Sequence, residues 1–281
     1  MREPLTHDPL AAGPFASAFA PGLLDGRVAL VSGGGSGIGR ATAQQLAALG
    51  ARVAVVGRRP EPLAEVVDAI HAHLGADPDQ PMAMAVSADV REPEQVDRAL
   101  DEVLGAWDRV DILVNNAGGQ FVSPAEAISY NGFRAVTRLN LDATWYMTVQ
   151  VAVRSMIPHG YGKVVSVVMS PRRAMPGMSH SSAARAAVES LTRTLAVEWG
   201  RHGIRINALA PGIIHTDAWE GYGLQPADVA RVIPAGALGT AEQVADSIVF
   251  LSTPASDYVT GATLLCDGGL DQTGPGADWG R

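Results

Sequence analysis

A glycine-rich turn near the start of the chain constrains the fold more than any other stretch. The turn spans residues 32–39, SGGGSGIG, and lies between an apolar segment, 27–32, and a helical pattern that ends at Gly50. Glycine permits a tight turn and lets the backbone approach a pyrophosphate, while the start of a helix offers free N–H groups and a positive dipole end. Strand, turn and helix in this order predict a nucleotide-binding site. Its expected members are Gly33, Ser36, Gly37, Ile38 and Gly39.

Short apolar segments recur along the chain and alternate with helical patterns. The expected strands are 27–32, 52–56, 82–87, 110–115, 163–169, 204–209 and 262–266. Nearly all-apolar strands are typical of a sheet that is covered on both faces, and helices between strands require right-handed crossovers. The predicted fold is α/β, a single-domain doubly wound (Rossmann) parallel sheet of seven strands with helices on both faces.

No linker or internal repeat divides the 281 residues. We expect an N-terminal extension at residues 1–22, which is rich in Ala and Pro, and one dinucleotide-binding and catalytic domain at residues 23–281. A net charge of −8 argues against nucleic acid as the main partner. Cys266 is the only cysteine and the seven histidines show no ligand spacing, so neither a disulfide nor a metal is expected.

Targeting signals are not evident. No apolar run approaches the ~20 residues of a membrane span, and the Ala- and Pro-rich start lacks the basic and apolar regions of a signal peptide. The final residues, 279–281, are not a peroxisomal address. The sequence therefore predicts a soluble, cytoplasmic protein.

The second expected strand indicates which nucleotide is preferred. An acidic residue about 20 positions beyond the glycines would bind a ribose 2′-hydroxyl. Here the chain reads Val56-Gly57-Arg58-Arg59, without an acid. Two guanidinium groups suit a 2′-phosphate, so Arg58 and Arg59 favour NADPH/NADP+ over NADH; the alternative is a solvated basic turn.

Further motifs complete a resemblance to a known family. They are Asp89-Val90, Asn115-Asn116-Ala117-Gly118, Asn140, Pro211-Gly212-Ile213-Ile214-His215-Thr216 and Gly268-Gly269. Together with the glycine-rich turn, these motifs resemble the short-chain dehydrogenase/reductase family over nearly all of the chain. The resemblance implies an oxidoreductase with adenine contacts near Asp89 and Val90 and ribose contacts near Asn116. It also implies cofactor contacts at Ala117, Gly118, Pro211, Gly212, Ile213 and Thr216.

One helix departs from the family pattern. Residues 180–199 read HSSAARAAVESLTRTLAVEW, with Ser181 and Arg185 where the family has the Tyr and Lys of Tyr-x-x-x-Lys. The sequence contains no such pair, because Lys163 has His159 four positions before it. The position of the family's usual catalytic serine falls near Val168, which is apolar. Ordinary ketone–alcohol interconversion is therefore disfavoured.

Reduction of a conjugated C=C bond makes a milder demand on the protein. Ketone reduction creates an alkoxide that needs a proton, and a phenol of pKa about 10 supplies it better than a serine hydroxyl. With an α,β-unsaturated thioester, hydride adds to the β-carbon and charge develops on the thioester oxygen. Fixed hydrogen-bond donors can stabilise that charge, and the α-carbon can be protonated more slowly, even through water.

A narrower resemblance agrees with this chemistry. Residues 115–129, NNAGGQFVSPAEAIS, and 180–199 are similar to the trans-2-enoyl-CoA and 2,4-dienoyl-CoA reductase branch of the family, in particular its peroxisomal trans-2-enoyl-CoA reductases. That branch also has Ser at the Tyr position and Lys or Arg four residues later. The resemblance implies an acyl-CoA substrate, a role in fatty acid metabolism and a homotetramer or dimer.

Roles can be assigned to the candidate catalytic residues as hypotheses. Ser181 and Arg185 are one helical turn apart and can face the nicotinamide together. Arg185 would hold the ribose hydroxyls, and Ser181 would donate to the ribose or to the thioester oxygen. Asn140 would position a water or the carbonyl. Ser170 is a further candidate donor, at a strand end where dienoyl reductases place an active Tyr; the alternative is a serine that caps the backbone.

Substrate contacts are expected outside this helix. Arg172 and Arg173 follow the fifth expected strand, where ligands gather in α/β sheets, and can bind CoA phosphates or form a basic surface loop. Met178 and the stretch 219–224, which contains Tyr222, are expected to line or cover the acyl pocket, and Gln120 is expected to contact the substrate.

Two other functions stay open. One is a ketone/alcohol oxidoreductase in which Arg185 replaces Lys and the proton donor is unrecognised. Lys163 is the only lysine among 21 basic residues, so an Arg at this position carries little information. The other is a catalytically silent homologue that binds NADPH as a sensor or as the partner subunit of an active relative.

Overall fold

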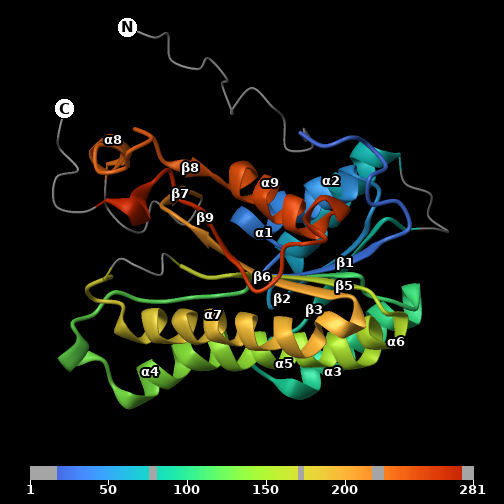
Figure 1. The fold of residues 1–281 in the computed structure, drawn as a ribbon, viewed down its shortest axis with the longest axis horizontal. Helices are drawn as coiled ribbons and strands as arrows, with labels where there is room; N and C mark the ends of the chain where they lie inside the picture. The colour runs from blue at the N-terminus through green and yellow to red at the C-terminus, as the bar shows by residue number, and fades with distance from the viewer. Residues whose placement is uncertain (1–17, 76–80, 170–173, 217–224, 274–281) are drawn as a thin grey trace, which may run out of the picture.

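A seven-stranded parallel sheet forms the centre of the molecule (Figure 1). The structure is a computed structural model, and it describes residues 18–75, 81–169, 174–216 and 225–273. The strands are β1 (Val28–Ser32), β2 (Arg52–Gly57), β3 (Ala83–Ser87), β4 (Ile112–Asn115), β5 (Gly162–Val167), β6 (Ile204–Pro211) and β9 (Thr263–Cys266). Their order in space is β3-β2-β1-β4-β5-β6-β9. The chain therefore reverses direction across the sheet between β1 and β4, where ligands bind in folds of this kind.

Helices cover both faces of this sheet, as Figure 1 shows. One face carries α1 (Gly37–Ala48), α2 (Pro60–Leu74) and α9 (Ala241–Ser252). The other carries α3 (Pro93–Trp107), α4 (Tyr130–Thr137), α5 (Ala143–Val151), α6 (Ile157–His159) and α7 (Ser179–Trp199). The short helix α8 (Pro226–Ala230) and the small pair β7 (Ile214–His215) and β8 (Gly239–Thr240) lie at one end. The predicted doubly wound fold is confirmed.

The hydrophobic pattern of the strands explains the two-sided core. All five residues of β1 are buried. Successive side chains of a strand point to opposite faces, so Ala29 and Val31 join the core layer beneath α1, α2 and α9. Val28 and Leu30 join the layer beneath α3, α5 and α7. Apolar burial on both faces is the main force that holds the helices to the sheet.

The expected strand boundaries agree with the structure to within about two residues. The largest differences are two residues each: β4 begins at Ile112, β5 ends at Val167, and β6 extends to Pro211, which lies opposite Cys266 in the parallel register with β9. The pair β7 and β8 was not predicted, because strands of two residues carry no periodic pattern.

The long helical run from α4 to α6 is interrupted by π-helical turns. One spans Arg138–Asp142 and the other Ala152–Met156. A π-helical turn inserts one extra residue into the helix and often marks a functional position. The first of these turns presents Asn140, which is almost fully buried, towards the loop after β4.

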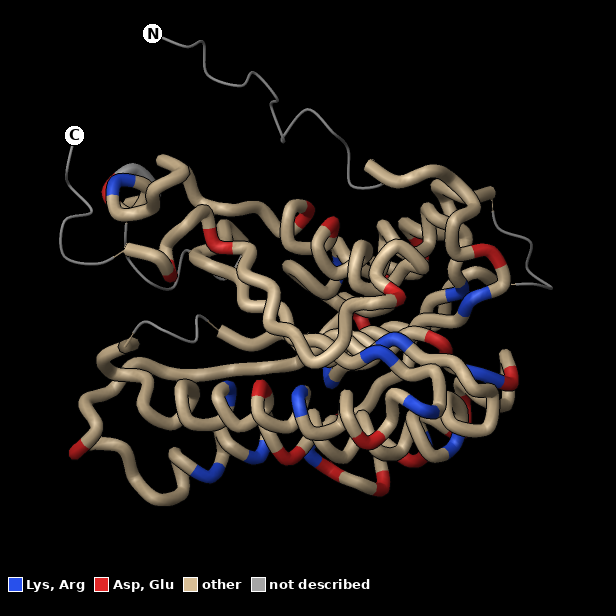
Figure 2. Tube along the Cα trace, viewed as in Figure 1, with Lys and Arg blue, Asp and Glu red and all other residues tan. Residues whose placement is uncertain are grey.

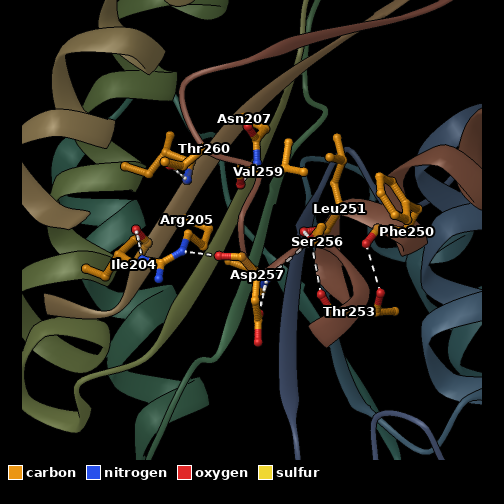
Figure 3. A network of polar contacts seen from close by, with 12 residues as sticks. Ile204, Arg205, Asn207, Phe250, Leu251, Thr253, Ser256, Asp257, Val259 and Thr260 are labelled. Carbon is orange, nitrogen blue, oxygen red and sulfur yellow. Dashed lines mark hydrogen bonds and ion pairs between the residues drawn. The ribbon is translucent and has the colours of Figure 1, made fainter. Parts of the chain in front are cut away.

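The only lysine is part of a polar network at the opposite edge of the sheet. Lys163 Nζ donates to Asp257 Oδ1 (2.7 Å) and to Ser256 Oγ (3.2 Å). Figure 3 shows the neighbouring contacts of this network, in which Arg205 Nε donates to the Asp257 carbonyl (2.6 Å). Burial lowers the pKa of Lys163, and the Asp257 carboxylate opposes that shift. Because Lys163 lies at the start of β5, it is remote from the carboxyl ends of the strands, where the candidate site lies.

Among the helices that the structure describes, none combines the length and the apolar character that a bilayer crossing requires.

Candidate functional site

The glycine-rich turn packs tightly at the carboxyl ends of β1 and β4. At Gly39 there is no room for a side chain, because a Cβ would overlap the carbonyl oxygen of Gly33 and lie 2.6 Å from Asn116 Nδ2. The backbone of the turn and the start of α1 therefore remain open to a ligand on the other side. This is the arrangement that lets N–H groups approach a pyrophosphate.

Polar side chains join this turn to the end of β4. Asn116 Nδ2 donates to the carbonyls of Ser32 and Gly33, at 3.1 Å each. The Ser32 hydroxyl accepts the backbone N–H groups of Asn116 and Ala117, also at 3.1 Å. These contacts fix the width of the crevice between β1 and β4.

A cavity of about 400 Å³ occupies this crevice. Its lining contains most of the predicted cofactor-binding residues: Gly33, Ser36, Gly37, Ile38, Arg58, Arg59, Asp89, Val90, Asn116, Ala117, Gly118 and Thr216. Gly39 lies beneath the turn and is not part of the lining. Pro211, Gly212 and Ile213 do not line it either; Gly212 packs against Asp267 beyond the end of β9.

The charges in the cavity are unevenly compensated. Asp89 is held by Arg91, whose side chain and backbone N–H both donate to its carboxylate. The hydrogen bond from the Arg91 side chain, helped by the charge of Arg58, lowers the pKa of Asp89. In the described part of the chain, Arg58 and Arg59 form no salt bridge of their own. Their guanidinium groups are available to an anionic ligand.

The loop after β4 passes between Asn140 and Arg185. Asn140 Nδ2 donates to the carbonyl of Gly119 (2.8 Å), and its Oδ1 accepts the N–H of the same residue (3.1 Å). A Cβ at Gly118 would overlap the Arg185 guanidinium and lie 2.9 Å from Asn140 Oδ1. A side chain at this position would have to displace the guanidinium, so Arg185 lies directly against Gly118, a lining residue of the cavity.

Arg185 is a cation without a carboxylate partner among the described residues. Its Nη1 donates to the carbonyl of Val167 at the end of β5. Burial lowers the pKa of Arg185 to about 10, which leaves the guanidinium charged at neutral pH. The charge is fixed close to Gly118, a lining residue of the cavity.

The buried Ser181, at the start of α7, contacts the exposed residue Gln120 of the loop after β4. The Ser181 hydroxyl donates to Gln120 Oε1 (3.0 Å). A serine hydroxyl has one proton to donate, so that of Ser181 is committed to Gln120. The carboxamide N–H groups of Gln120 take no part in this hydrogen bond. His180 does not contact the Ser181 hydroxyl; its Nδ1 accepts the Ser181 backbone N–H (2.8 Å).

The structure therefore brings together Asn140, Ser181, Arg185 and Gln120 around the loop after β4. Met178 lies just before α7, and its N–H donates to the carbonyl of Met175 (3.1 Å). The candidate residues Ser170, Arg172, Arg173 and Tyr222 lie outside the described residues. Their predicted roles stay predictions.

Sequence reasoning missed several residues that build the site. Gly119 makes both bonds to Asn140, and Leu139 lines the cavity beside it. Ser32 was predicted only as the last residue of a strand, yet its hydroxyl joins β1 to β4. Gly119 follows directly after a recognised motif and Leu139 precedes Asn140, so motif adjacency was the only available signal.

Comparisons with known proteins identify the family of the chain. A sequence profile described as enoyl-(acyl carrier protein) reductase matches residues 33–271. The chain belongs to the short-chain dehydrogenase/reductase family, an oxidoreductase family with the doubly wound fold described above and a nicotinamide dinucleotide cofactor.

The relatives include reductases of unsaturated acyl-CoA. The chain is 34% identical over 256 residues to a peroxisomal 2,4-dienoyl-CoA reductase of Danio rerio, covering 89% of this chain and 83% of that one. It is 36% identical over 253 residues to a probable 2,4-dienoyl-CoA reductase of Bacillus subtilis (88% and 97%). Among solved structures, a citronellol catabolism dehydrogenase (AtuB) of Pseudomonas aeruginosa PAO1 is 40% identical, with a TM-score of 0.80 and coverage of 91% and 99%.

The tight passage at Gly118 leads to a first prediction. Replacing Gly118 with Ala should raise the Kd of the nicotinamide cofactor by about tenfold or more, equivalent to ~1.4 kcal/mol, because the new Cβ displaces the Arg185 guanidinium. Fluorescence titration with NADPH and NADH measures this effect. Gly105→Ala on α3 is the matched control, since a Cβ there meets nothing within 4 Å. An unchanged Kd in Gly118→Ala would contradict the placement of Arg185.

Proposed function

We propose that the protein is an NADPH-dependent reductase of the C=C bond of a 2-enoyl or 2,4-dienoyl acyl-CoA thioester. The observation that carries the proposal is the hydrogen bond from Ser181 to Gln120, at the helix position where the family has its proton-donating Tyr. This pair supplies neutral hydrogen-bond donors without a group as acidic as a phenol. Such a site suits a reaction whose developing charge needs stabilisation more than immediate protonation.

Gln120 is the proposed donor to the substrate. With Oε1 engaged by Ser181, the carboxamide orients its two N–H groups in a fixed direction. A thioester oxygen placed against these N–H groups becomes more negative as the β-carbon accepts the hydride that a bound NADPH supplies. A preorganised donor stabilises this charge without reorganisation cost. In this proposal Ser181 positions Gln120, and water protonates the α-carbon.

Arg185 is the proposed fixed positive charge of the site. It stays protonated at neutral pH, because its pKa of about 10 is well above 7. The Val167 carbonyl and the neighbouring Gly118 hold the guanidinium beside the cavity. From there it can hold the ribose hydroxyls of the cofactor and increase the donor strength of nearby groups.

Asn140 is proposed as a positioning residue. The sequence predicts that its side chain positions a water or the substrate carbonyl. Instead, both polar atoms of that side chain are bonded to Gly119, and its backbone carbonyl accepts the Thr144 hydroxyl (3.0 Å). Its effect on the reaction is therefore to hold Gly119, and with it Gln120, at the site.

The preference for NADPH is supported by the two arginines at the end of β2. Arg58 and Arg59 line the cavity without a salt bridge of their own in the described structure. The nearest acidic candidate, Asp89, is engaged by Arg91. A 2′-phosphate would thus meet two available guanidinium groups, whereas an unphosphorylated ribose would meet no free carboxylate at this end of the cavity.

We also propose that the protein is a homo-oligomer, a tetramer or dimer. An open groove of about 710 Å³ lies between α5 and α7. Leu141, Trp145, Ala187 and Leu191 line it, and Trp145 is 48% exposed. Exposed aromatic and aliphatic side chains gathered in this way are typical of a surface that is covered by another chain.

Turnover of acyl thioesters tests the proposed function directly. We expect NADPH oxidation with crotonyl-CoA and trans-2-decenoyl-CoA, and a kcat/KM for acetoacetyl-CoA at least about 100-fold lower, since a positioned general acid contributes 10²-fold or more. The absorbance of NADPH measures both reactions. Turnover of acetoacetyl-CoA alone would identify a ketone reductase instead. Tight NADPH binding without any turnover would identify a silent homologue.

A charge substitution tests the role of Gln120. In Gln120→Glu, an oxygen still accepts the Ser181 proton, but the N–H donors are replaced by an anionic oxygen. We expect kcat with crotonyl-CoA to fall by about 10²- to 10³-fold, the usual cost of losing an oxyanion donor, with the Kd of NADPH unchanged. Ser181→Ala, which only frees the carboxamide to rotate, should cost less. Equal losses in the two variants would contradict this division of roles.

Cofactor titrations test the role of Arg58 and Arg59. The double variant Arg58→Ala/Arg59→Ala should raise the Kd of NADPH by about tenfold or more, because hydrogen bonds between charged groups contribute about 1.5–3 kcal/mol each. The Kd of NADH should change little. Arg98→Ala, which removes one positive charge from the exposed face of α3, is the control for a general effect of charge. Wild-type affinities for NADPH and NADH within about threefold of each other would overturn the preference.

A further inference from the structure

An apolar surface extends outward from Gln120. It consists of Phe121, Val122 and Met175, whose side chains are 42%, 63% and 38% exposed. The two segments that carry them are in contact: Ser123 N–H donates to the Gly177 carbonyl (2.9 Å), and a Cβ at Gly177 would lie 2.9 Å from Val122. Exposed apolar side chains that form one patch usually mark a binding surface.

The ring of Phe121 is held rigidly although much of it faces solvent. Its edge-to-face contact with His180 has a centroid distance of 4.4 Å and an interplanar angle of 89°. On another side, a Cβ at Gly132 would lie 3.1 Å from Phe121 Cζ, so the ring packs against a glycine of α4. His180 is fully buried and fixed by the Ser181 N–H. Two consecutive residues of α7 therefore hold the aromatic ring and Gln120: His180 contacts the ring and Ser181 binds Gln120.

We propose that the surface formed by Phe121, Val122 and Met175 binds the acyl chain of the substrate, and that Phe121 determines a preference for medium- and long-chain enoyl thioesters. This inference rests on the proposed function. The side chains of Gln120 and Phe121 contact consecutive residues of α7, Ser181 and His180, so the acyl chain of a thioester held by Gln120 can reach the ring within a few carbon atoms. The chain beyond the double bond would lie on the ring instead of in water.

The charge of the loop distinguishes the acyl chain from the CoA moiety. Between Gly118 and Arg134 the chain has no cation and a single anion, Glu126. Figure 2 shows this loop at the lower left, tan except for one red residue. Phosphates need cationic or N–H-rich surfaces, whereas an alkyl chain needs an apolar one. The surface therefore orients the substrate with its acyl chain on this side and CoA on another.

The expected effect follows from the burial of methylene groups. Each methylene moved fully out of water increases affinity about fourfold, and on a surface that stays partly open we expect about half of this in free energy, or roughly twofold per methylene. From crotonyl-CoA to trans-2-decenoyl-CoA, the wild-type kcat/KM should therefore rise roughly 10- to 100-fold.

The experiment compares these two substrates in the full chain. In Phe121→Ala, kcat/KM for trans-2-decenoyl-CoA should fall about tenfold or more, while that for crotonyl-CoA should stay within about threefold. Val122→Asp, a change at a more exposed side chain that leaves the buried contacts intact, should show the same pattern. Tyr258→Ala is the control, because Tyr258 is a fully exposed aromatic residue beside Asp257, at the opposite edge of the sheet.

A binding measurement separates this inference from the proposed function. Calorimetric titration of the NADP+-loaded protein with decanoyl-CoA and butanoyl-CoA needs no turnover. A wild-type preference for decanoyl-CoA that is lost in Phe121→Ala and Val122→Asp supports the inference even if no enoyl thioester is reduced. Equal affinities for both ligands, or a preference that both variants keep, overturn it. A change of oligomeric mass in the variants, with chain preference intact, assigns the surface to a second copy and also overturns it.

Discussion

The site depends on the passage of the backbone between Asn140 and Arg185. Gly118 has no room for a side chain beside the guanidinium, and Gly119 is bonded at both its N–H and its carbonyl to Asn140. The next residue is Gln120, which therefore has little freedom before its side chain meets Ser181. One constraint on the backbone thus positions the cofactor wall, the fixed cation and the proposed substrate donor together.

This arrangement gives a physical reason why a serine can replace the tyrosine of the family without ending catalysis. A phenol both donates a hydrogen bond and releases a proton, and the serine hydroxyl does the second poorly. In the proposed mechanism the Ser181 hydroxyl orients the Gln120 carboxamide, and the carboxamide N–H groups donate to the substrate. The loss of an acidic proton donor hinders reduction of a ketone, because the alkoxide must be protonated at once. It hinders reduction of a conjugated thioester less, because hydrogen bonds can stabilise the negative charge until the α-carbon is protonated.

The strands could be predicted because each is a short apolar segment that is covered on both faces, as β1 is. The glycine-rich turn could be predicted because its glycines lie between a strand and a helix. The bond between Ser181 and Gln120 could not, because it joins residues 61 positions apart whose approach depends on how α7 docks against the loop after β4. The π-helical turn at Asn140 has no sequence signature, since an extra residue in a helix leaves the local composition unchanged. The sequence motifs identify the residues of the candidate site. Tertiary packing determines which of their polar atoms remain free to bind a ligand.

The unpaired charge of Arg185 links the stability of the site to ligand binding. The partly buried Arg185 guanidinium has no carboxylate partner among the described residues, so it costs free energy, and its lowered pKa expresses that cost. A carboxylate beside Arg185 would remove the cost but would also repel an anionic dinucleotide and an enolate. Leaving the charge uncompensated in the free protein means that the compensation comes from the ligand, so cofactor binding should stabilise the fold as well as prepare the reaction. Arg58 and Arg59 also lack salt bridges within the described structure, but they are exposed to solvent and therefore do not carry a comparable desolvation cost.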